Sequence, residues 1–270
     1  MKLHRVTIFA VLSLLLLGAL SGCDKAKVKA SANGTGADAT TVTYEKILNG
    51  DPVDEASAPQ LVEIALLYGD GSAGICSGVV IGPQEILSAT HCFLDNPEDV
   101  QVLHNGIPLE VFEVVAAPGF RSEQAVSAFF NDVAIIKTAP HGLPAFPVLQ
   151  STPVTPGEEV IILGYGLDEE GNFGTLKSGV ARIEIVTPNH LFTAPYYGKD
   201  GSNPCFGDSG GPALVERKGT AGESIFALAG VVSSGTTDNC LDGDVTLFTS
   251  LQDPAVVDFL SRYASGISFL

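Results

Sequence analysis

The stretch Gly207-Asp208-Ser209-Gly210-Gly211-Pro212 governs the interpretation of the whole sequence. A nucleophilic serine needs an exposed hydroxyl on a tight turn, with backbone N–H groups free to face a developing oxyanion. Flanking glycines permit such a turn and let a substrate approach the backbone closely. Ser209 is therefore a candidate nucleophile, and its partners must be sought elsewhere in the chain.

The order of these partners along the chain separates two classes of hydrolase. The letters around Ser209 also match the G-x-S-x-G pattern of α/β-hydrolases, but there a histidine follows the serine, and none follows Ser209. His91, in the run SATHC, ends a strand-like segment. Asp132 opens the apolar run 133–136 and suits a buried acid that holds an imidazole in one tautomer. The remaining histidines, His4, His104, His141 and His190, lie in the N-terminal segment or in polar or Pro/Gly-rich surroundings.

Four motifs occur in an order that resembles the chymotrypsin/trypsin family of serine endopeptidases. They are SATHC (88–92), NDVAIIK (131–137), GYG (164–166) and CFGDSGGP (205–212). The resemblance implies an all-β fold of two six-stranded antiparallel β-barrels, with the active site between them and a short C-terminal helix. It also implies a His91–Asp132–Ser209 triad, an oxyanion hole made by the N–H groups of Gly207 and Ser209, and no cofactor.

Cysteine usage agrees with an exported protein. Five cysteines are present. Cys23 resembles the lipidated cysteine of bacterial lipoproteins, and the other four allow three pairings. Export favours disulfides, and because no CxxC pair or cysteine–histidine cluster occurs, we expect no metal site. The family resemblance implies that Cys76 pairs with Cys92, and Cys205 with Cys240.

Short β-branched runs separated by turn residues predict strands along most of the chain. Helical periodicity appears only near the end, where Asp253 can cap a helix and Pro254 suits its first turn. The segment STPVTPG (151–157) is linker-like, so we predict an N-terminal barrel over 47–150 and a C-terminal barrel over 151–270. The predicted strands are 61–67, 78–81, 110–115, 133–136, 160–163, 180–186, 226–232 and 245–247.

The N-terminus carries the features of an export signal. Lys2 and Arg5 precede an apolar run, 6–20, that is short for a membrane span and predicts a signal peptide over 1–22. The sequence Leu20-Ser21-Gly22-Cys23 resembles the lipobox of bacterial lipoproteins, which implies lipidation of Cys23. An ordinary secretory signal with an incidental cysteine is the alternative.

Residues 23–46 bury almost nothing, so they predict a flexible tether or propeptide. The expected location is therefore outside the cytoplasm, on a lipid anchor at the periplasmic face or the cell surface. From residue 47 onward, 28 acidic residues face 8 basic ones, a balance of −20. Such acidity argues against nucleic acid or anionic lipid as a partner, which leaves the anchor as the membrane contact and polypeptides as substrates.

The resemblance also indicates where substrate side chains bind. The position at the floor of the specificity pocket, six residues before Ser209, is Asn203, so a buried Lys or Arg would lack a compensating charge there. The backbone of Ser233-Ser234-Gly235 should pair with the substrate as an added strand. Thr246 should narrow the pocket, which predicts uncharged, small-to-medium P1 residues. If the loop before Thr246 differs in length by one or two residues from that of the family, Asp242 or Asp244 enters the pocket instead.

The stretch YEKILNG (44–50) marks the start of patterned sequence. In the family it resembles, a precursor is cut after a basic residue, here Lys46, and the freed ammonium, here that of Ile47, pairs with the acid before the nucleophile, here Asp208. The alternative is a surface lysine before a first strand. Because Asn203 disfavours cleavage after lysine, we expect another protease to make this cut, which would also release the domain from its anchor.

Three alternatives to a peptidase remain at this point. A catalytically silent protease fold could serve as a binding or regulatory lipoprotein, although every triad and oxyanion position is filled. An exported esterase could use the same triad, but the backbone-binding run 233–235 favours peptides. A purely structural surface lipoprotein would leave the ordered motifs as coincidence.

Overall fold

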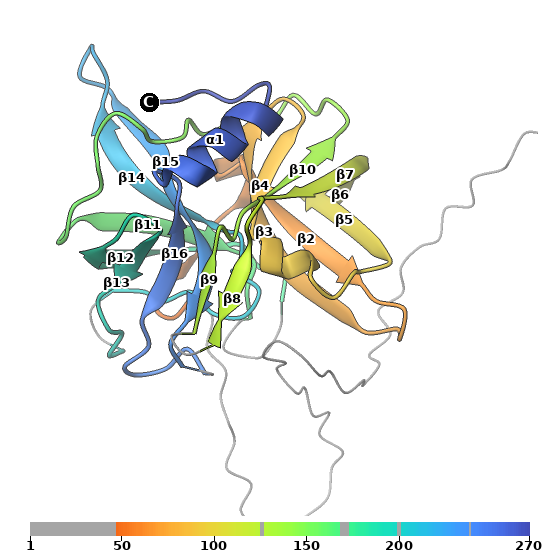
Figure 1. Cartoon of the computed structure of the whole chain (residues 1–270), viewed down its shortest axis with the longest axis horizontal. Coiled ribbons are helices and arrows are strands. Elements are labelled where there is room, and N and C mark those ends of the chain that lie inside the picture. Colours follow the sequence, from red (N-terminus) through yellow and green to blue (C-terminus); the bar gives the residue numbers. More distant parts are fainter. Residues whose placement is uncertain (1–46, 125–126, 168–172, 199–200, 238) are drawn as a thin grey trace, which may run out of the picture.

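The computed structural model describes residues 47–124, 127–167, 173–198, 201–237 and 239–270. The signal peptide, Cys23, the tether and Lys46 lie outside these residues. Two β-sheets stand side by side, one in orange to green and the other in green to blue (Figure 1). No helix within the described residues is long and apolar enough to span a membrane.

The first sheet is a seven-membered antiparallel ladder in the order β6-β5-β2-β3-β4-β10-β7. Its end members β6 and β7 are separated by Glu110 alone, so they form one bent strand that pairs with β5 first and β10 next. This bend brings the sheet round on itself and makes it a six-stranded barrel. The strands are β2 (Leu61–Leu67), β3 (Ala73–Gly82), β4 (Glu85–Ser88), β5 (Asp99–His104), β6 (Ile107–Leu109), β7 (Val111–Ala116) and β10 (Ala134–Thr138).

The second sheet closes through hydrogen bonds. Its order is β1-β12-β11-β14-β15-β16-β13, and an additional β12–β13 pairing joins the ends of a six-stranded antiparallel barrel. The short β1 is an extra strand on β12. The strands are β1 (Asp51–Pro52), β11 (Glu159–Gly164), β12 (Lys177–Val186), β13 (His190–Thr193), β14 (Pro212–Lys218), β15 (Ser224–Gly235) and β16 (Thr246–Ser250).

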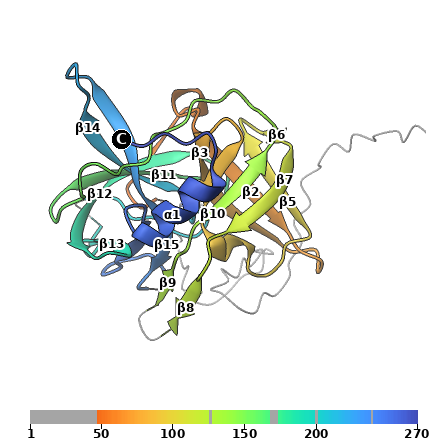
Figure 2. The same cartoon turned by 45° about the horizontal axis from the view of Figure 1, so that its top comes forward.

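The barrels pack on each other through a shared apolar layer. One buried cluster combines residues of the first barrel, such as Leu61, with residues of the second, such as Leu214, and with Phe259 of helix α1 (Pro254–Tyr263). Separate clusters fill each barrel interior. Because the shared layer excludes water, burial of its apolar surface stabilises the relative placement of the barrels. Figure 2 shows α1 lying across both barrels.

Three smaller elements complete the fold. Two are 3-10 helices, over Glu55–Ser57 and Thr90–Phe93, of which the second follows β4 directly. The third is a two-stranded hairpin of β8 (Arg121–Glu123) and β9 (Ala128–Phe130), which leads into the residues before β10. The all-β fold with a short C-terminal helix, expected from the sequence, is thus confirmed.

The helix begins as the sequence predicts. The Asp253 side chain accepts a hydrogen bond from the Ala255 N–H at 2.8 Å, and Pro254 occupies the first turn. Val256, Phe259 and Leu260 are buried, whereas Tyr263 remains 42% exposed. The helix therefore presents the face of these three residues to the shared apolar layer.

Replacing Asp253 by alanine should destabilise the protein by about 1–2 kcal/mol, because the cap is lost and the Asn189 amide loses its acceptor. Urea unfolding of Asp253→Ala against wild type measures this. Asp258→Ala, which removes the exposed i,i+4 pair with Arg262, is the matched control and should cost less than about 0.5 kcal/mol. Equal losses in both variants would contradict the assigned cap.

Candidate active site

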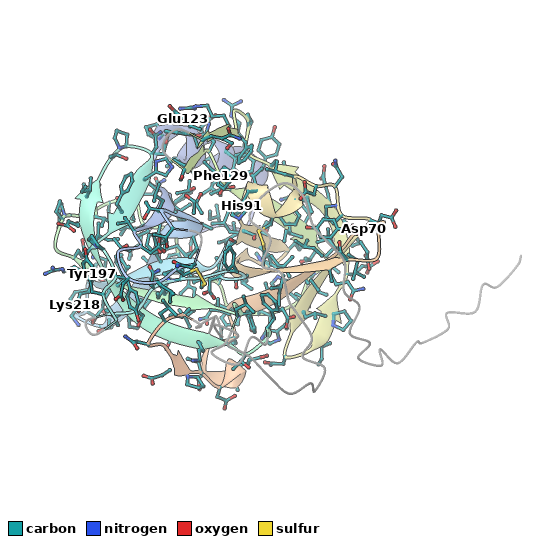
Figure 3. The ribbon with its side chains drawn as sticks, turned by 90° about the horizontal axis from the view of Figure 1, so that it is seen from below. Asp70, His91, Glu123, Phe129, Tyr197 and Lys218 are labelled. Carbon is teal, nitrogen blue, oxygen red and sulfur yellow. A yellow bond between two sulfur atoms is a disulfide. The ribbon has the colours of Figure 1, made fainter. Side chains whose placement is uncertain are left out.

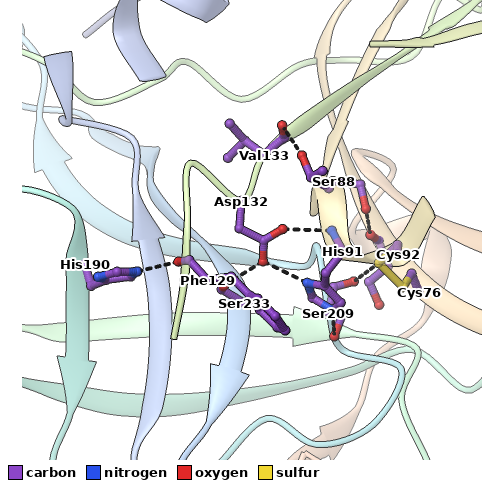
Figure 4. Close-up of polar contacts among 12 residues, drawn as sticks. Cys76, Ser88, His91, Cys92, Phe129, Asp132, Val133, His190, Ser209 and Ser233 are labelled. Atoms are coloured by element: carbon purple, nitrogen blue, oxygen red, sulfur yellow. Dashed lines mark hydrogen bonds and ion pairs between the residues drawn. A yellow bond between two sulfur atoms is a disulfide. The ribbon is translucent and has the colours of Figure 1, made fainter. Parts of the chain in front are cut away.

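His91, Asp132 and Ser209 come together from three separate segments. Ser209 lies on the turn before β14, His91 in the 3-10 helix after β4, and Asp132 just before β10. The His91 Nε2 atom lies 2.9 Å from Ser209 Oγ, and Nδ1 lies 2.7 Å from Asp132 Oδ2. The three side chains form the connected chain of contacts in Figure 4. The view in Figure 3 has His91 near the centre of the molecule.

Asp132 is enclosed by donors. It has no solvent exposure, and it accepts hydrogen bonds from the His91 backbone N–H at 2.8 Å and from the Ser233 hydroxyl at 2.6 Å. A buried carboxylate accepts only, so Nδ1 of His91 carries a proton and Nε2 is left to accept from the Ser209 hydroxyl. The arrangement can remove a proton from Ser209 and stabilise the resulting imidazolium.

The turn that carries Ser209 is clamped by both barrels. The Ser209 carbonyl accepts a hydrogen bond from the Ser77 N–H of β3 at 2.8 Å, and the Gly210 N–H donates to the Val232 carbonyl of β15 at 2.9 Å. Gly210 has φ of 83°, and a Cβ there would lie 2.1 Å from Ser88 Oγ. Only glycine fits this left-handed, crowded position, which explains the residue after the nucleophile.

The backbone before Ser209 is arranged for an oxyanion. Gly207 has φ of 91°, and its carbonyl accepts from the Ser77 hydroxyl at 2.9 Å. The preceding carbonyl, of Phe206, accepts from Leu167 N–H at 2.8 Å, which turns the Gly207 N–H the opposite way because a trans peptide is planar. Among the described residues, no acceptor pairs with the N–H of Gly207 or Ser209.

Asp208 is directed away from the triad, into the second barrel. It is 1% exposed, and its two oxygens accept from the Gly166 and Cys205 N–H groups, each at 2.9 Å. A Cβ on Gly164 or Gly166 would lie within 2.7 Å of this carboxylate, so the GYG motif leaves space for it. Burial raises the pKa of Asp208 to about 7, although these hydrogen bonds and the charge of Lys177 lower it.

The predicted new N-terminus lies inside the protein. Ile47 is 1% exposed and packs in the core of the second barrel, with Cγ2 2.9 Å from where a Gly179 Cβ would be. The next residue, Leu48, exchanges backbone hydrogen bonds with Asn203. Residue 47 is therefore held beside the segment that leads to Ser209.

Asn203 lies in contact with both Thr246 and Asp244. The Thr246 hydroxyl donates to Asn203 Oδ1 at 2.7 Å, and Asn203 Nδ2 donates to Asp244 Oδ2 at 2.8 Å. Asp244 is 1% exposed, and its Oδ1 also accepts from the Thr236 and Thr237 N–H groups at 2.8 Å. A buried carboxylate thus ties the segment after Gly235 to Asn203. The sequence left open whether Asp242 or Asp244 would lie here.

The run 233–235 ends β15 beside the triad. Ser234 and Gly235 pair with Leu247 and Thr246 of β16 through their backbones. Ser233 has a second function that the sequence did not indicate, because its hydroxyl donates to Asp132 rather than facing outward.

Two disulfides brace the site. Cys76 joins Cys92, adjacent to His91, and Cys205 joins Cys240 beside Asn203, whose amide donates to the Cys240 carbonyl at 3.1 Å. Both pairings agree with those that the family resemblance implies.

Phe129 is a site residue that sequence reasoning missed. Its ring stacks on the His91 imidazole with centroids 5.1 Å apart, and its carbonyl lies 2.7 Å from Nε2 of His190. His190, expected in polar surroundings, is in fact 3% exposed among aromatic rings. The position of Phe129, three residues before Asp132, was the only available signal, because contacts of the β8–β9 hairpin with the second barrel are invisible in the sequence.

Comparison with known proteins agrees with this geometry. The trypsin family model matches residues 47–257. The human protein serine protease 56 is 25% identical over 234 residues, 74% of this chain and 36% of that protein. The cercarial protease of Schistosoma mansoni is 29% identical over 237 residues, 73% of this chain and 84% of that protein. The vitellin-degrading protease of Bombyx mori is 26% identical over 220 residues.

The chain spans about a third of the length of its mammalian relatives, so the comparison covers only part of them. The range matched by the family model includes His91, Asp132 and Ser209 and both disulfides. The match to the family model and the fold agree, and the chain belongs to the trypsin family of serine endopeptidases.

Proposed function

We propose that this protein is an exported serine endopeptidase that hydrolyses peptide bonds through His91, Asp132 and Ser209 and a covalent acyl-enzyme. The observation that carries the proposal is the 2.9 Å contact between His91 Nε2 and Ser209 Oγ, backed by a carboxylate without solvent exposure. Three segments would have no reason to converge in this way for structural purposes alone.

The reaction begins with the Ser209 hydroxyl. His91 Nε2 takes its proton as Oγ attacks the peptide carbonyl, and the same proton then passes to the leaving amine. Asp132 keeps the imidazole in position and stabilises its positive charge, with Ser233 and the His91 N–H holding the carboxylate. Water then attacks the acyl-enzyme with His91 again as the base.

The oxyanion of each tetrahedral intermediate is bound by the N–H groups of Gly207 and Ser209. Support comes from their free donors and from the Leu167–Phe206 hydrogen bond that orients the peptide before Gly207. One such donor contributes about 3–4 kcal/mol to transition-state stabilisation in comparable enzymes.

Polypeptides are the proposed substrates, with an uncharged P1 residue. The backbone of residues 233–235 lies beside the triad and would receive the substrate as an added strand. The proposed pocket ends at Asn203 and Thr246, where the Thr246 hydroxyl donates a hydrogen bond to Asn203 Oδ1. Although Asp244 brings a negative charge, its oxygens already accept from Asn203, Thr236 and Thr237, so neutral donors of the pocket compensate it.

The protein is proposed to be made as a precursor. Its parts are a signal peptide (1–22), a tether lipidated at Cys23 (23–46), a first barrel (47–150) and a second barrel (151–270). The anchor and a bacterial source rest on the lipobox-like sequence alone, because the related proteins described above come from animals. The division near residue 150 agrees with the two sheets, although residues 47–52 lie with the second.

Activation is proposed to follow cleavage after Lys46 by another protease. The ammonium of Ile47 would then pair with Asp208 and hold the Gly207 N–H in place. Support comes from the burial of Ile47 and from the burial of Asp208, which raises the pKa of its carboxyl group. The cut would also separate the barrels from the lipid on Cys23.

A fluorophosphonate probe should label the processed protein, and Ser209→Ala should abolish labelling and lower peptide hydrolysis by roughly 10⁶-fold, as loss of a nucleophile does. Mass spectrometry of the labelled peptide locates the site. Ser224→Ala, which removes an exposed hydroxyl at the opposite end of β15 from Ser233, is the control and should label normally. Absence of labelling in the processed protein, or labelling that persists in Ser209→Ala, would contradict the protease assignment.

Cleavage sites mapped in a proteome digest should follow uncharged, small-to-medium P1 residues. Thr246→Gly should raise kcat/KM for aromatic P1 residues by roughly tenfold, because a methyl and a hydroxyl leave the pocket. Val245→Ala changes the neighbouring side chain and should leave the profile unaltered. Predominant cleavage after Lys or Arg would refute the P1 proposal and assign Asp244 to a substrate cation.

Cleavage after Lys46 should raise kcat by at least about tenfold, since an oxyanion donor becomes fixed. The ammonium has an intrinsic pKa near ~8, which pairing with Asp208 raises. The contribution of the Ile47 ammonium to activity is therefore fully present below this raised pKa and is lost as pH increases through it. Detergent phase separation before and after the cut should show activity moving to the aqueous phase. Equal activity of the cut and uncut protein would contradict the activation step.

A further inference from the structure

Lys177 is a buried cation that the proposed mechanism does not use. It is the first residue of β12 and only 4% exposed. Burying an ammonium is expensive unless negative charge lies nearby, so the position of this side chain relative to acidic groups needs an explanation.

The register of the sheet directs Lys177 toward Asp208. Lys177 lies directly opposite Gly164 in the antiparallel β11–β12 pair. Side chains of directly opposite residues project from the same face of a sheet. A Cβ on Gly164 would lie 2.1 Å from Asp208 Oδ1, so this face is the one that carries the Asp208 carboxylate.

The charge of Lys177 acts electrostatically on Asp208. It lowers the pKa of this carboxyl group, against the larger effect of burial, which raises it. Lys177 also has other interactions. Its contribution to Asp208 is a positive electrostatic potential through the protein interior, where charges are weakly screened. Within the described residues, the carboxylate also accepts hydrogen bonds from the neutral N–H groups of Cys205 and Gly166.

Ile47 approaches the same region from the neighbouring position. Gly179 follows Lys177 by two residues and therefore faces the same side of β12. Ile47 Cγ2 lies 2.9 Å from where a Gly179 Cβ would be. Residue 47 thus lies beside the face of β12 from which Lys177 projects.

We propose that Lys177 is a positioning residue that keeps Asp208 ionised and directed at the Gly166 and Cys205 N–H groups before the chain is cut. The uncut precursor consequently has a partly formed oxyanion hole and a basal peptidase activity, to which the Ile47 ammonium adds. This rests on the proposed function, in which Asp208 acts on Gly207.

The test uses the full-length chain with Lys46→Gln, which blocks cleavage after residue 46. In this uncut protein we expect measurable hydrolysis of a peptide substrate, and Lys177→Met should lower kcat by at least about tenfold, with KM changed less than about threefold. Lys177→Arg should retain kcat within about threefold, since it preserves the charge. In the cut enzyme, Lys177→Met should change kcat by less than about threefold, because the Ile47 ammonium replaces the lost charge.

The pH profile distinguishes an electrostatic role from a merely structural one. Uncut activity should show no fall near pH ~8, whereas cut activity should fall above ~8 to the uncut level. In the cut Lys177→Met variant, the activity that remains above pH ~8 should disappear.

An inactive uncut chain whose cut form is active overturns the inference and leaves the proposed function intact. So does a Lys177→Met effect of the same size in both forms, or an uncut profile that falls near pH ~8. If neither form hydrolyses peptides or reacts with the fluorophosphonate probe, the proposed function itself has failed.

Discussion

The burial of Asp208 is the constraint on which the rest of the site depends. A carboxylate with 1% exposure must be met by donors, and here the Gly166 and Cys205 N–H groups meet it. Satisfying it draws the GYG turn and the segment before Ser209 together, which sets the Gly207 backbone. The two glycines of GYG follow from the same constraint, because a Cβ at either would strike the carboxylate.

The site also depends on the contact between the barrels. Ser209 is held by Ser77 of the first barrel and, through Gly210, by Val232 of the second. Asp132 of the first barrel is held by Ser233 of the second. Any shift of one barrel against the other would break these hydrogen bonds together, so the apolar layer that joins the barrels is also what keeps the distances between the reacting groups.

Most of the candidate site could be predicted from the sequence, because it resides in short motifs with local physical causes. Ser209 stands among glycines that a tight turn requires, Asp132 lies two residues before a strand, and Asp253 caps the helix. The specificity pocket could be predicted only in part. Asn203 and Thr246 were expected there, but the entry of Asp244 depends on the path of a loop, which is decided by hydrogen bonds to Thr236 and Thr237.

By itself, the sequence located eight of the strands, the helix, the candidate nucleophile and its candidate acid and base, since periodicity, capping and turn chemistry act over a few residues. It missed other strands, among them Glu85–Ser88, Asp99–His104, His190–Thr193 and Pro212–Lys218. Only the tertiary structure decided that Ser233 supports Asp132, that Phe129 covers His91 and that Lys177 faces Asp208. These pairs are separated by many residues or lie on different sheets. The physical reason is that strand register and barrel packing, rather than local preference, determine which distant side chains share a buried space.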